Sequence, residues 1–349
     1  MNRVYLRLRR RAAGLLGIVF LVSGILKLSD PVGTMLIVTE YLKFLHLAWI
    51  TPAARILGVL FSFTECLVGI GLITGVLRKV SALLSYVLLG GFTVLTLLLW
   101  IFDAPMDCGC FGEAIHLTHA QSFLKNVGLL LLAAFAFTPF KEFGRARKRK
   151  AVSAFFATLA IVAGAIYSNR HLPVVDFTPF NWGARLFASL DDEAGEEEFR
   201  RAPILSISDA NGEYQDEMAA VGRVVIFSVY DPAKANWALV EEQYRTASFS
   251  QALPLVLVAG RPEDVPLPAD VQLLYADYKT LITLNRSNGG GSFFYDGELM
   301  HKWDAHHCPE TLVEDLNGDP DALSTRHVTR RRVTAQGFCV VMLAILMLL

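Results

Sequence analysis

Apolar runs dominate the first half of the chain, and short polar or basic stretches separate them. Runs of roughly 17 to 25 apolar residues are long enough to cross the hydrocarbon layer of a membrane as helices. Five such runs are predicted as membrane spans: residues 12–28, 53–74, 80–102, 123–140 and 151–168. A sixth run, residues 333–349, closes the chain and is predicted to cross as well.

The pattern changes to that of a soluble domain at residue 169 and stays so to residue 329. Two short β-branched runs, 224–230 and 254–259, predict buried strands, and Asp296-Gly297 favours a tight hairpin turn. Helical spacing over 235–247 and a shorter run at 276–284 predict helices, and the hairpin strands are predicted at 292–295 and 298–303. The order strand, helix, strand, helix, hairpin is that of the thioredoxin fold.

The soluble segment resembles a thioredoxin-like domain that has no dithiol of its own. The place of the expected Cys-x-x-Cys, after the first strand, holds Asp231-Pro232-Ala233-Lys234. Glycines 289–291 stand where a cis-proline is expected. The prediction is therefore an α/β scaffold that binds a client or partner surface. Cys308 directly follows two histidines, a spacing that fits a structural zinc site poorly.

Composition supports the membrane class, and basic residues predict orientation. The chain is 53% hydrophobic and 19% charged, with a mean hydropathy of +0.42, too apolar for an ordinary soluble protein. The arginines at positions 3, 7, 9, 10 and 11 place the N-terminus in the cytoplasm by the positive-inside rule. The first apolar run lacks a signal-peptide cleavage site, so it is predicted to be a retained helix. The basic run 145–150 is topogenic, so we expect lipid and no nucleic acid as partner.

These patterns divide the chain into five parts. The predicted parts are a basic cytoplasmic N-terminus (1–11), a four-helix membrane domain (12–140), a basic loop with a fifth span (141–168), an extracytoplasmic domain (169–329) and a C-terminal membrane helix (330–349). The fold class is therefore a mainly α membrane protein with an appended α/β domain. Arginines 326 and 330–332 lie on the predicted outer side, against the positive-inside rule.

The candidate chemistry lies in Asp107-Cys108-Gly109-Cys110-Phe111-Gly112, on the predicted outer loop after span three. Cys108 and Cys110 fit a redox dithiol, because exchange requires an accessible thiolate and glycine permits a tight ring. A structural disulfide, metal ligation and inert thiols stay open as alternatives. Asp107 would raise the pKa of the neighbouring thiol.

Two further candidates lie within the spans. Glu65 is an ionisable group deep in span two, where such groups are costly and are paired or functional. It serves either as a structural partner of Lys27 or in proton or quinone chemistry. Cys66 beside it is a third membrane thiol.

Three motifs resemble the DoxX family and its relative MauE, over about residues 12–140. They are Ser23-Gly24-x-x-Lys27 followed by Asp30-Pro31, Glu65 followed by Val68-Gly69-x-Gly71, and the Cys108-Gly109-Cys110 loop. With the cysteine-poor thioredoxin-like domain added, the layout is similar to that of long DoxX-like proteins of Bacteroidetes-type bacteria.

The resemblance implies a multi-pass protein of the bacterial inner membrane. It implies extracytoplasmic thiol–disulfide or quinone-linked redox chemistry, or maturation of a periplasmic partner, since MauE is associated with maturing a disulfide-rich enzyme of methylamine metabolism. No cofactor motif is visible in the sequence, and a quinone is the candidate cofactor. The alternative is a non-enzymatic assembly factor or anchor whose cysteine pair is a structural disulfide. A third reading is a quinone-linked subunit of an oxidase.

Overall fold

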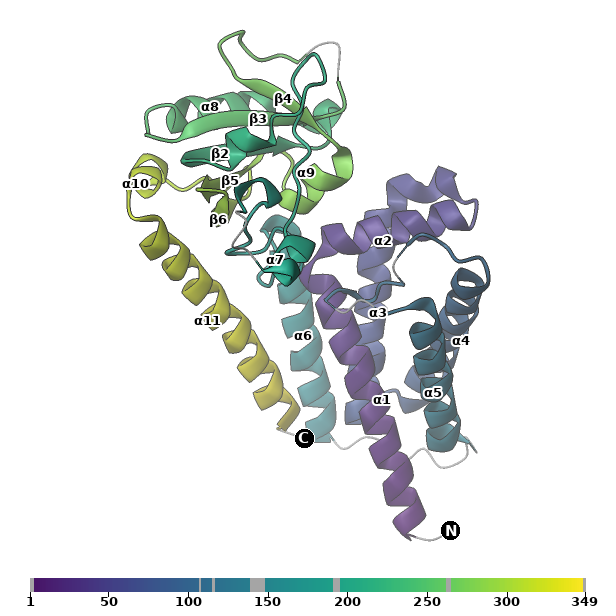
Figure 1. The fold of residues 1–349 in the computed structure, drawn as a ribbon. Helices are drawn as coiled ribbons and strands as arrows, with labels where there is room; N and C mark the ends of the chain where they lie inside the picture. Colours follow the sequence, from purple (N-terminus) through teal and green to yellow (C-terminus); the bar gives the residue numbers. More distant parts are fainter. Residues whose placement is uncertain are drawn as a thin grey trace. The chain divides into compact units, whose positions relative to one another are not determined.

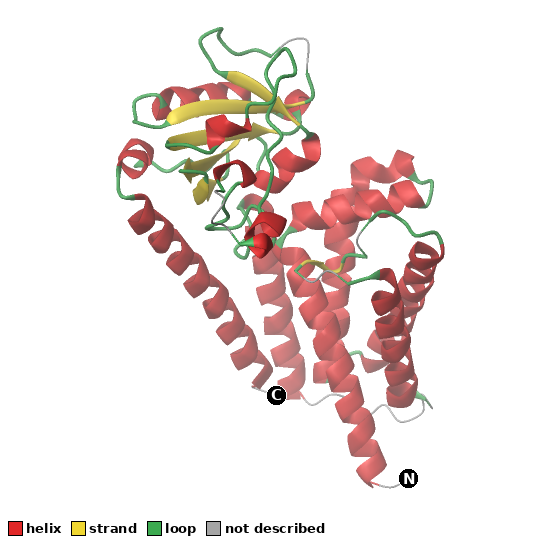
Figure 2. Ribbon diagram, viewed as in Figure 1, coloured by secondary structure: helices red, strands yellow, loops and turns green. Residues whose placement is uncertain are grey.

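The computed structural model describes residues 3–106, 108–114, 117–138, 148–190, 195–261 and 265–347 (Figure 1). It divides into two compact units. Unit 1 comprises Met1–Arg170 and Gln336–Leu349, and unit 2 comprises His171–Ala335. Figure 2 shows the strands of the sheet in unit 2 and long helices in unit 1.

Unit 1 is a bundle of long apolar helices. Its elements are α1 (Arg3–Ser29), α2 (Pro31–Phe44), a 3₁₀ helix (Ala48–Ala53), α3 (Ala54–Thr74), α4 (Arg78–Ile101), β1 (Cys110–Glu113), α5 (His119–Phe137) and α6 (Lys148–Arg170). Among the described residues, five helices are long and apolar enough to cross a membrane: Arg3–Ser29, Ala48–Thr74, Arg78–Ile101, His119–Phe137 and Lys148–Arg170. They confirm that the five runs predicted before residue 169 form helices long and apolar enough to cross a membrane.

The helix α2 was not predicted, because its residues lie between the first two predicted spans, where no helix was assigned. Asp30 caps it by accepting a hydrogen bond of 2.9 Å from the Gly33 amide, and Pro31 occupies its first turn. Both are standard helix-start signals, since a carboxylate satisfies a free amide and proline loses no hydrogen bond there. The helix brings Tyr41 to the cysteine loop, a contact that was not predicted from the sequence.

The helices α1 and α3 pack through glycine. A Cβ atom added at Gly17 would lie 2.9 Å from the Gly69 carbonyl oxygen, and one at Gly69 would lie 2.7 Å from the Gly17 carbonyl oxygen. About two turns further along α1, a Cβ at Gly24 would lie 2.5 Å from the Cys66 sulfur. Small residues let membrane helices approach closely, so side chains that flank these glycines can meet between the helices.

Unit 2 is built on a mixed five-stranded sheet in the order β4-β3-β2-β5-β6. Its strands are β2 (Arg223–Val229), β3 (Leu253–Ala259), β4 (Leu273–Ala276), β5 (Gly290–Tyr295) and β6 (Glu298–Trp303). Strands β2, β3 and β4 are parallel, and β5 and β6 are antiparallel to their neighbours. The predicted strands and hairpin are confirmed, whereas β4 was missed and Ala276, predicted as helical, ends that strand.

Helices and short turns connect the strands and close unit 2. They are α7 (Glu196–Arg201), α8 (Trp237–Ala247), α9 (Tyr278–Leu284) and α10 (Leu312–Asn317), with 3₁₀ turns at Phe187–Ser189, Asp216–Ala219 and Pro232–Lys234. Two clusters of buried apolar side chains, one containing Phe227 and Phe293 and the other Ile226 and Phe294, form the core. Alternate residues of β2 and β5 therefore supply the two clusters, as expected of strands buried on both faces.

The last helix, α11 (Pro320–Met347), begins upstream of the predicted start at residue 330. Its residues to Ala335 belong to unit 2, and those from Gln336 belong to unit 1. The arginines that precede the predicted span are part of this helix, because no proline or glycine separates them from the apolar run. Its described residues are not among the five candidate spans, so a sixth crossing stays a prediction.

Candidate functional site

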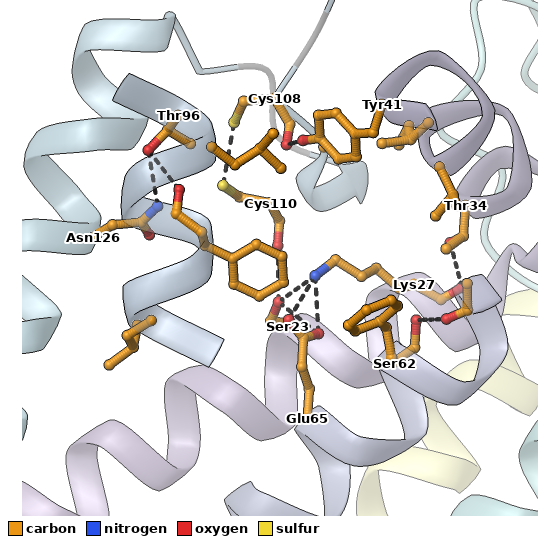
Figure 3. A pocket seen from close by; sticks show the side chains of 18 of the residues that line it. Ser23, Lys27, Thr34, Tyr41, Ser62, Glu65, Thr96, Cys108, Cys110 and Asn126 are labelled. Atoms are coloured by element: carbon orange, nitrogen blue, oxygen red, sulfur yellow. Dashed lines mark hydrogen bonds and ion pairs between the residues drawn. The ribbon is translucent and has the colours of Figure 1, made fainter. Parts of the chain in front are cut away.

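A buried ion pair links α1 to α3. The Lys27 amine lies 2.8 Å from one carboxylate oxygen of Glu65 and 2.9 Å from the other (Figure 3). The side chains are only 11% and 3% exposed. A charge inside a membrane bundle is costly unless it is paired, and here each charge has its partner. The structure thus brings together two of the residues predicted from the sequence.

One hydroxyl connects this ion pair to the cysteine loop. Ser23 donates to the Cys110 carbonyl oxygen at 2.8 Å, and the same hydroxyl oxygen lies 3.2 Å from both Glu65 and the Lys27 amine. Ser23 lies one turn before Lys27 on α1, so both side chains share a face of that helix. The charged pair and the backbone of the thiol loop are therefore parts of one polar network.

The cysteine loop is held in a tight, fixed shape. Gly109 has a φ of +55°, and a Cβ atom there would lie 2.4 Å from a methyl carbon of Ile37 on α2. Only glycine fits, both for its conformation and for the close approach. The Tyr41 hydroxyl donates to the Cys108 carbonyl oxygen. As a result the two sulfurs lie 3.2 Å apart as free thiols.

The two thiols have different environments. Cys108 is buried, and its sulfur lies 2.6 Å from the Ser122 hydroxyl on α5. Cys110 is half-buried. The hydrogen bond from the Cys108 thiol lowers the pKa of Cys110, burial opposes this, and the charges of Lys125 and Lys27 lower it further. The same hydrogen bond, with burial, raises the pKa of Cys108. These environments favour the thiolate on Cys110 over the thiolate on Cys108.

A mostly apolar cavity of about 260 Å³ lies beside the pair. Cys108, Cys110, Lys27 and Glu65 all line it, and the rest of the wall is formed largely by aliphatic and phenyl side chains from α1 to α5. Figure 3 shows the Lys27 amine and the two cysteines around this space. The charged pair and the thiols therefore open onto the same interior volume.

Sequence reasoning missed the contribution of α5. Ser122, Lys125 and Asn126 lie on one face of this helix, three and four residues apart, and the latter two line the cavity. The visible signal was the adjacent pair Lys125-Asn126 inside a predicted apolar span, where polar residues are rare. Cys66 lies in the α1–α3 interface rather than in the cavity wall, and Asp107 lies outside the described residues.

In unit 2 the place expected for a dithiol is closed by hydrogen bonds. The Asn288 amide group donates to the Asp231 carbonyl at 2.8 Å and accepts from its N–H at 3.0 Å. A Cβ at Gly290 would lie 2.6 Å from Asn285, and one at Gly291 would lie 2.1 Å from the Trp303 ring. Neighbouring side chains thus fill the space where a cis-proline was expected.

His307, one of the two histidines before Cys308, has other partners. His307 lies 2.7 Å from a carboxylate oxygen of Asp304, and its ring stacks on His171. In the parts of the chain that the structure describes, no group of three or more His, Cys, Asp or Glu side chains could hold a metal ion.

Comparison with known proteins relates the first part of the chain to one family. The family model of methylamine utilisation protein MauE matches residues 6–139, which run from α1 to the end of α5 and contain the ion pair, the cysteine loop and the cavity. Searches of curated proteins and of solved structures returned no match. Residues 6–139 of this chain are therefore similar to the MauE family, and their apolar helices fit a membrane protein.

Proposed function

We propose that the protein is a membrane thiol–disulfide oxidoreductase and that Cys108 and Cys110 are its reactive pair. The observation that carries this proposal is the approach of two free sulfurs to 3.2 Å in a loop held by Tyr41 and Ser23. The neighbouring cations Lys125 and Lys27 favour the thiolate of Cys110. A pair with one stabilised thiolate suits exchange better than a structural staple does.

The more exposed Cys110 exchanges with the partner, and the buried Cys108 is the thiolate that leaves when the disulfide of the pair opens. When the pair is oxidised, a partner thiolate attacks the Cys110 sulfur, breaks the Cys108–Cys110 bond and forms a mixed disulfide. The second partner thiolate then attacks its own mixed-disulfide sulfur, which releases Cys110 and leaves the partner oxidised. Two electrons pass from the partner dithiol to the pair. Such a reaction would introduce disulfides into a periplasmic protein, in keeping with a role in maturation.

The same proposal assigns the compartments. The N-terminal arginines favour a cytoplasmic start for α1, which puts the cysteine loop on the extracytoplasmic side of a bacterial inner membrane. Unit 2 has the strand order and mixed directions of a thioredoxin-like domain, which supports that identity. With its dithiol position closed, it serves as the surface that binds the partner.

Trapping the redox state in cells tests the proposal. Rapid acid quenching, alkylation and mass spectrometry should find Cys108 and Cys110 changing state together when the medium is made oxidising or reducing. In a Cys108→Ser variant the Cys110 thiolate can still attack the disulfide of an oxidised partner, the reverse of this exchange, and with no Cys108 to displace the partner a mixed disulfide on Cys110 should accumulate, whereas the Cys66→Ser control should not. A pair that stays in one redox state under all conditions contradicts the proposal.

A second candidate function is that of a non-enzymatic assembly factor. Its support is the closed dithiol position in unit 2, where the Asn288 side chain hydrogen-bonds both the carbonyl and the N–H of Asp231. In this case unit 2 binds the partner and the cysteine pair is a staple. If the double variant Cys108→Ser/Cys110→Ser still matures the partner, this second function is the correct one.

A further inference from the structure

We propose that the cavity beside the cysteine pair binds the ring of a lipid-soluble quinone, which takes electrons from Cys108 and Cys110. The inference rests on the proposed function of the pair and names the acceptor that returns it to the disulfide. Each time the disulfide of this pair oxidises a partner it is reduced to a dithiol, so it needs such an acceptor for every turnover. The cavity is the place in the described structure where that acceptor can meet both sulfurs, because both cysteines line it.

Size and polarity define the class of ligand. The volume of about 260 Å³ lies just below the range of roughly 300 to 1,000 Å³ that is usual for small-molecule sites. It therefore suits a head group of one or two fused rings and excludes a bulky nucleotide cofactor. Phe20, Phe61 and Phe92 are among the apolar walls, which favour a flat apolar ring over a charged or sugar-like one.

The cavity has an apolar rim. Leu45, just after α2, and Phe61 on α3 line it, and they are 42% and 48% exposed on the surface of a bundle built from membrane-crossing helices. Phe61 lies on a candidate membrane-crossing helix, where a side chain with this exposure faces lipid. A ligand that enters here comes from the hydrocarbon phase and can keep a prenyl-type tail outside, between the lipids. A water-soluble electron acceptor would have to cross the same apolar rim.

The cavity also has two polar groups that can bind the two ring oxygens, once the Lys27 amine exchanges its bond to Ser23 for one to the ring. Lys27 on α1 and Asn126 on α5 both line it, and Figure 3 shows them on different sides of the space. A quinone carries two carbonyl oxygens on opposite sides of its ring, so this arrangement can hold one at each side. Glu65, which is 2% exposed and hydrogen-bonded to Lys27, supplies a proton-carrying group next to one of them.

The reaction balances with these groups and one proton from water. The Cys108 S–H bond breaks, one S–S bond forms between Cys108 and the Cys110 thiolate, and two electrons pass to the ring. The Cys108 proton ends on one ring oxygen, and the other oxygen takes a proton from the Lys27 ammonium beside Glu65, which a proton from water restores, so that the quinone becomes a quinol. The oxidised pair can then accept electrons from the partner dithiol.

The test uses the full-length protein in detergent, reduced with dithiothreitol and freed of reductant. A short-chain benzoquinone and a short-chain naphthoquinone serve as separate probes. We expect one quinol formed for every two thiols lost, with at least one of the two probes. Val38→Trp, which adds bulk at the cavity wall, should slow this reaction at least tenfold. Val87→Trp, the same change at a residue 61% exposed outside the wall, should leave the rate unchanged.

Binding is measured separately from electron transfer, in a Cys108→Ser/Cys110→Ser background. The effective probe should raise the Tm of this protein and fail to raise that of the same protein carrying Val38→Trp. Absence of quinol formation and of any Tm shift with both probes overturns the inference, and so does an equal shift in the Val38→Trp protein, which would indicate adsorption elsewhere.

A third measurement separates this inference from the proposed function. An aromatic disulfide reagent should oxidise the Cys108–Cys110 pair equally fast in the Val38→Trp and unmodified proteins. Normal reaction with the disulfide but none with either quinone refutes the cavity assignment and leaves the proposed exchange intact. Failure with the disulfide as well refutes both.

Discussion

The two units use glycine for close packing with opposite results. In unit 1, Gly17, Gly24 and Gly69 bring two helices together and leave a charged pair, two thiols and a cavity between the elements around them. In unit 2, Gly290 and Gly291 admit Asn285 and Trp303, and the space is filled. Close backbone approach is therefore not a sign of a site by itself. What distinguishes unit 1 is that its buried polar groups face an unfilled volume.

The difference also separates fold from chemistry. Unit 2 has the sheet from which a redox function would be guessed by analogy, yet its expected dithiol position holds Asp231 fixed by Asn288. The helical unit, whose fold suggests no particular reaction, holds the two sulfurs and the cations beside them. Function has to be argued from the site rather than from the fold. Four predictions would break or sharpen this contrast.

The largest effect should follow from breaking the ion pair of unit 1. Glu65→Ala leaves the Lys27 ammonium buried without its partner, which costs about 3–5 kcal/mol when a buried pair loses one member. Equilibrium unfolding in mixed detergent micelles measures it. The double variant Lys27→Met/Glu65→Leu removes both charges and should recover most of the loss. A loss below about 1 kcal/mol in Glu65→Ala would show that water or lipid head groups already solvate the pair.

A smaller loss should follow from one methyl group between α1 and α3. Gly24→Ala places a Cβ 2.5 Å from the Cys66 sulfur and 2.6 Å from the Ser62 carbonyl oxygen, and overpacking of this kind costs about 1–3 kcal/mol. Gly14→Ala on the same helix is the matched control, because a Cβ there meets nothing within 4 Å. Equal stability of the two variants in the same unfolding assay would mean that the helices separate without cost.

How far the sequence could predict these features depends on the range of the interactions. Apolar length predicted the five spans, and β-branched runs with Asp296-Gly297 predicted four of the five strands of the sheet, because these signals are local. The strand β4 was missed since Leu273–Ala276 is short, and only its pairing with β3 defines it. The helix α2 was missed although Asp30-Pro31 is a local start signal.

The composition of the site was only partly predictable. Glu65 and Lys27 were picked out because ionisable residues in apolar spans are rare. They lie 38 residues apart in sequence, however, and their ion pair depends on the glycine packing between α1 and α3. Tyr41, Ser122 and Lys125 belong to the site only through tertiary contacts with the cysteine loop. The cavity depends on side chains from five helices, and no single stretch of sequence specifies it.

The third prediction concerns the thiolate of Cys110. Lys125→Met removes a positive charge beside this sulfur, so the pKa of Cys110 should rise by about one unit, the lower part of the range for a neighbouring opposite charge. The pH dependence of Cys110 alkylation reports it, in a Cys66→Ser background that removes the other membrane thiol. Lys125→Arg keeps the charge and should keep the profile. An unchanged profile in Lys125→Met would mean that the hydrogen bond from Cys108, rather than the charge of Lys125, lowers the pKa of Cys110.

The smallest effect is expected in unit 2, from the stacked rings of His301 on β6 and His327 on α11, whose centroids lie 3.6 Å apart. Burial, opposed by Asp315 and helped by nearby arginines, lowers the pKa of His327 to about 4. Burial and the charges of His327, Arg331 and Arg326 lower the pKa of His301 as well. The unfolded chain then binds more protons than the folded one below pH 6.5, so unit 2 should lose stability as the pH falls from 6.5 towards 4.

Because His327 is only half-buried, solvent screens its share of this loss, which we expect to stay below about 1 kcal/mol. Urea unfolding followed by tryptophan fluorescence measures it in a Trp49→Phe/Trp100→Phe background, where the three remaining tryptophans all belong to unit 2. His327→Phe keeps a ring against His301 and removes one titrating group, so its stability should vary less with pH. If the variant and its parent lose stability in parallel, the pH dependence comes from other groups. The difference between the two units would then be larger, because the histidine pair in unit 2 would contribute nothing to its pH dependence.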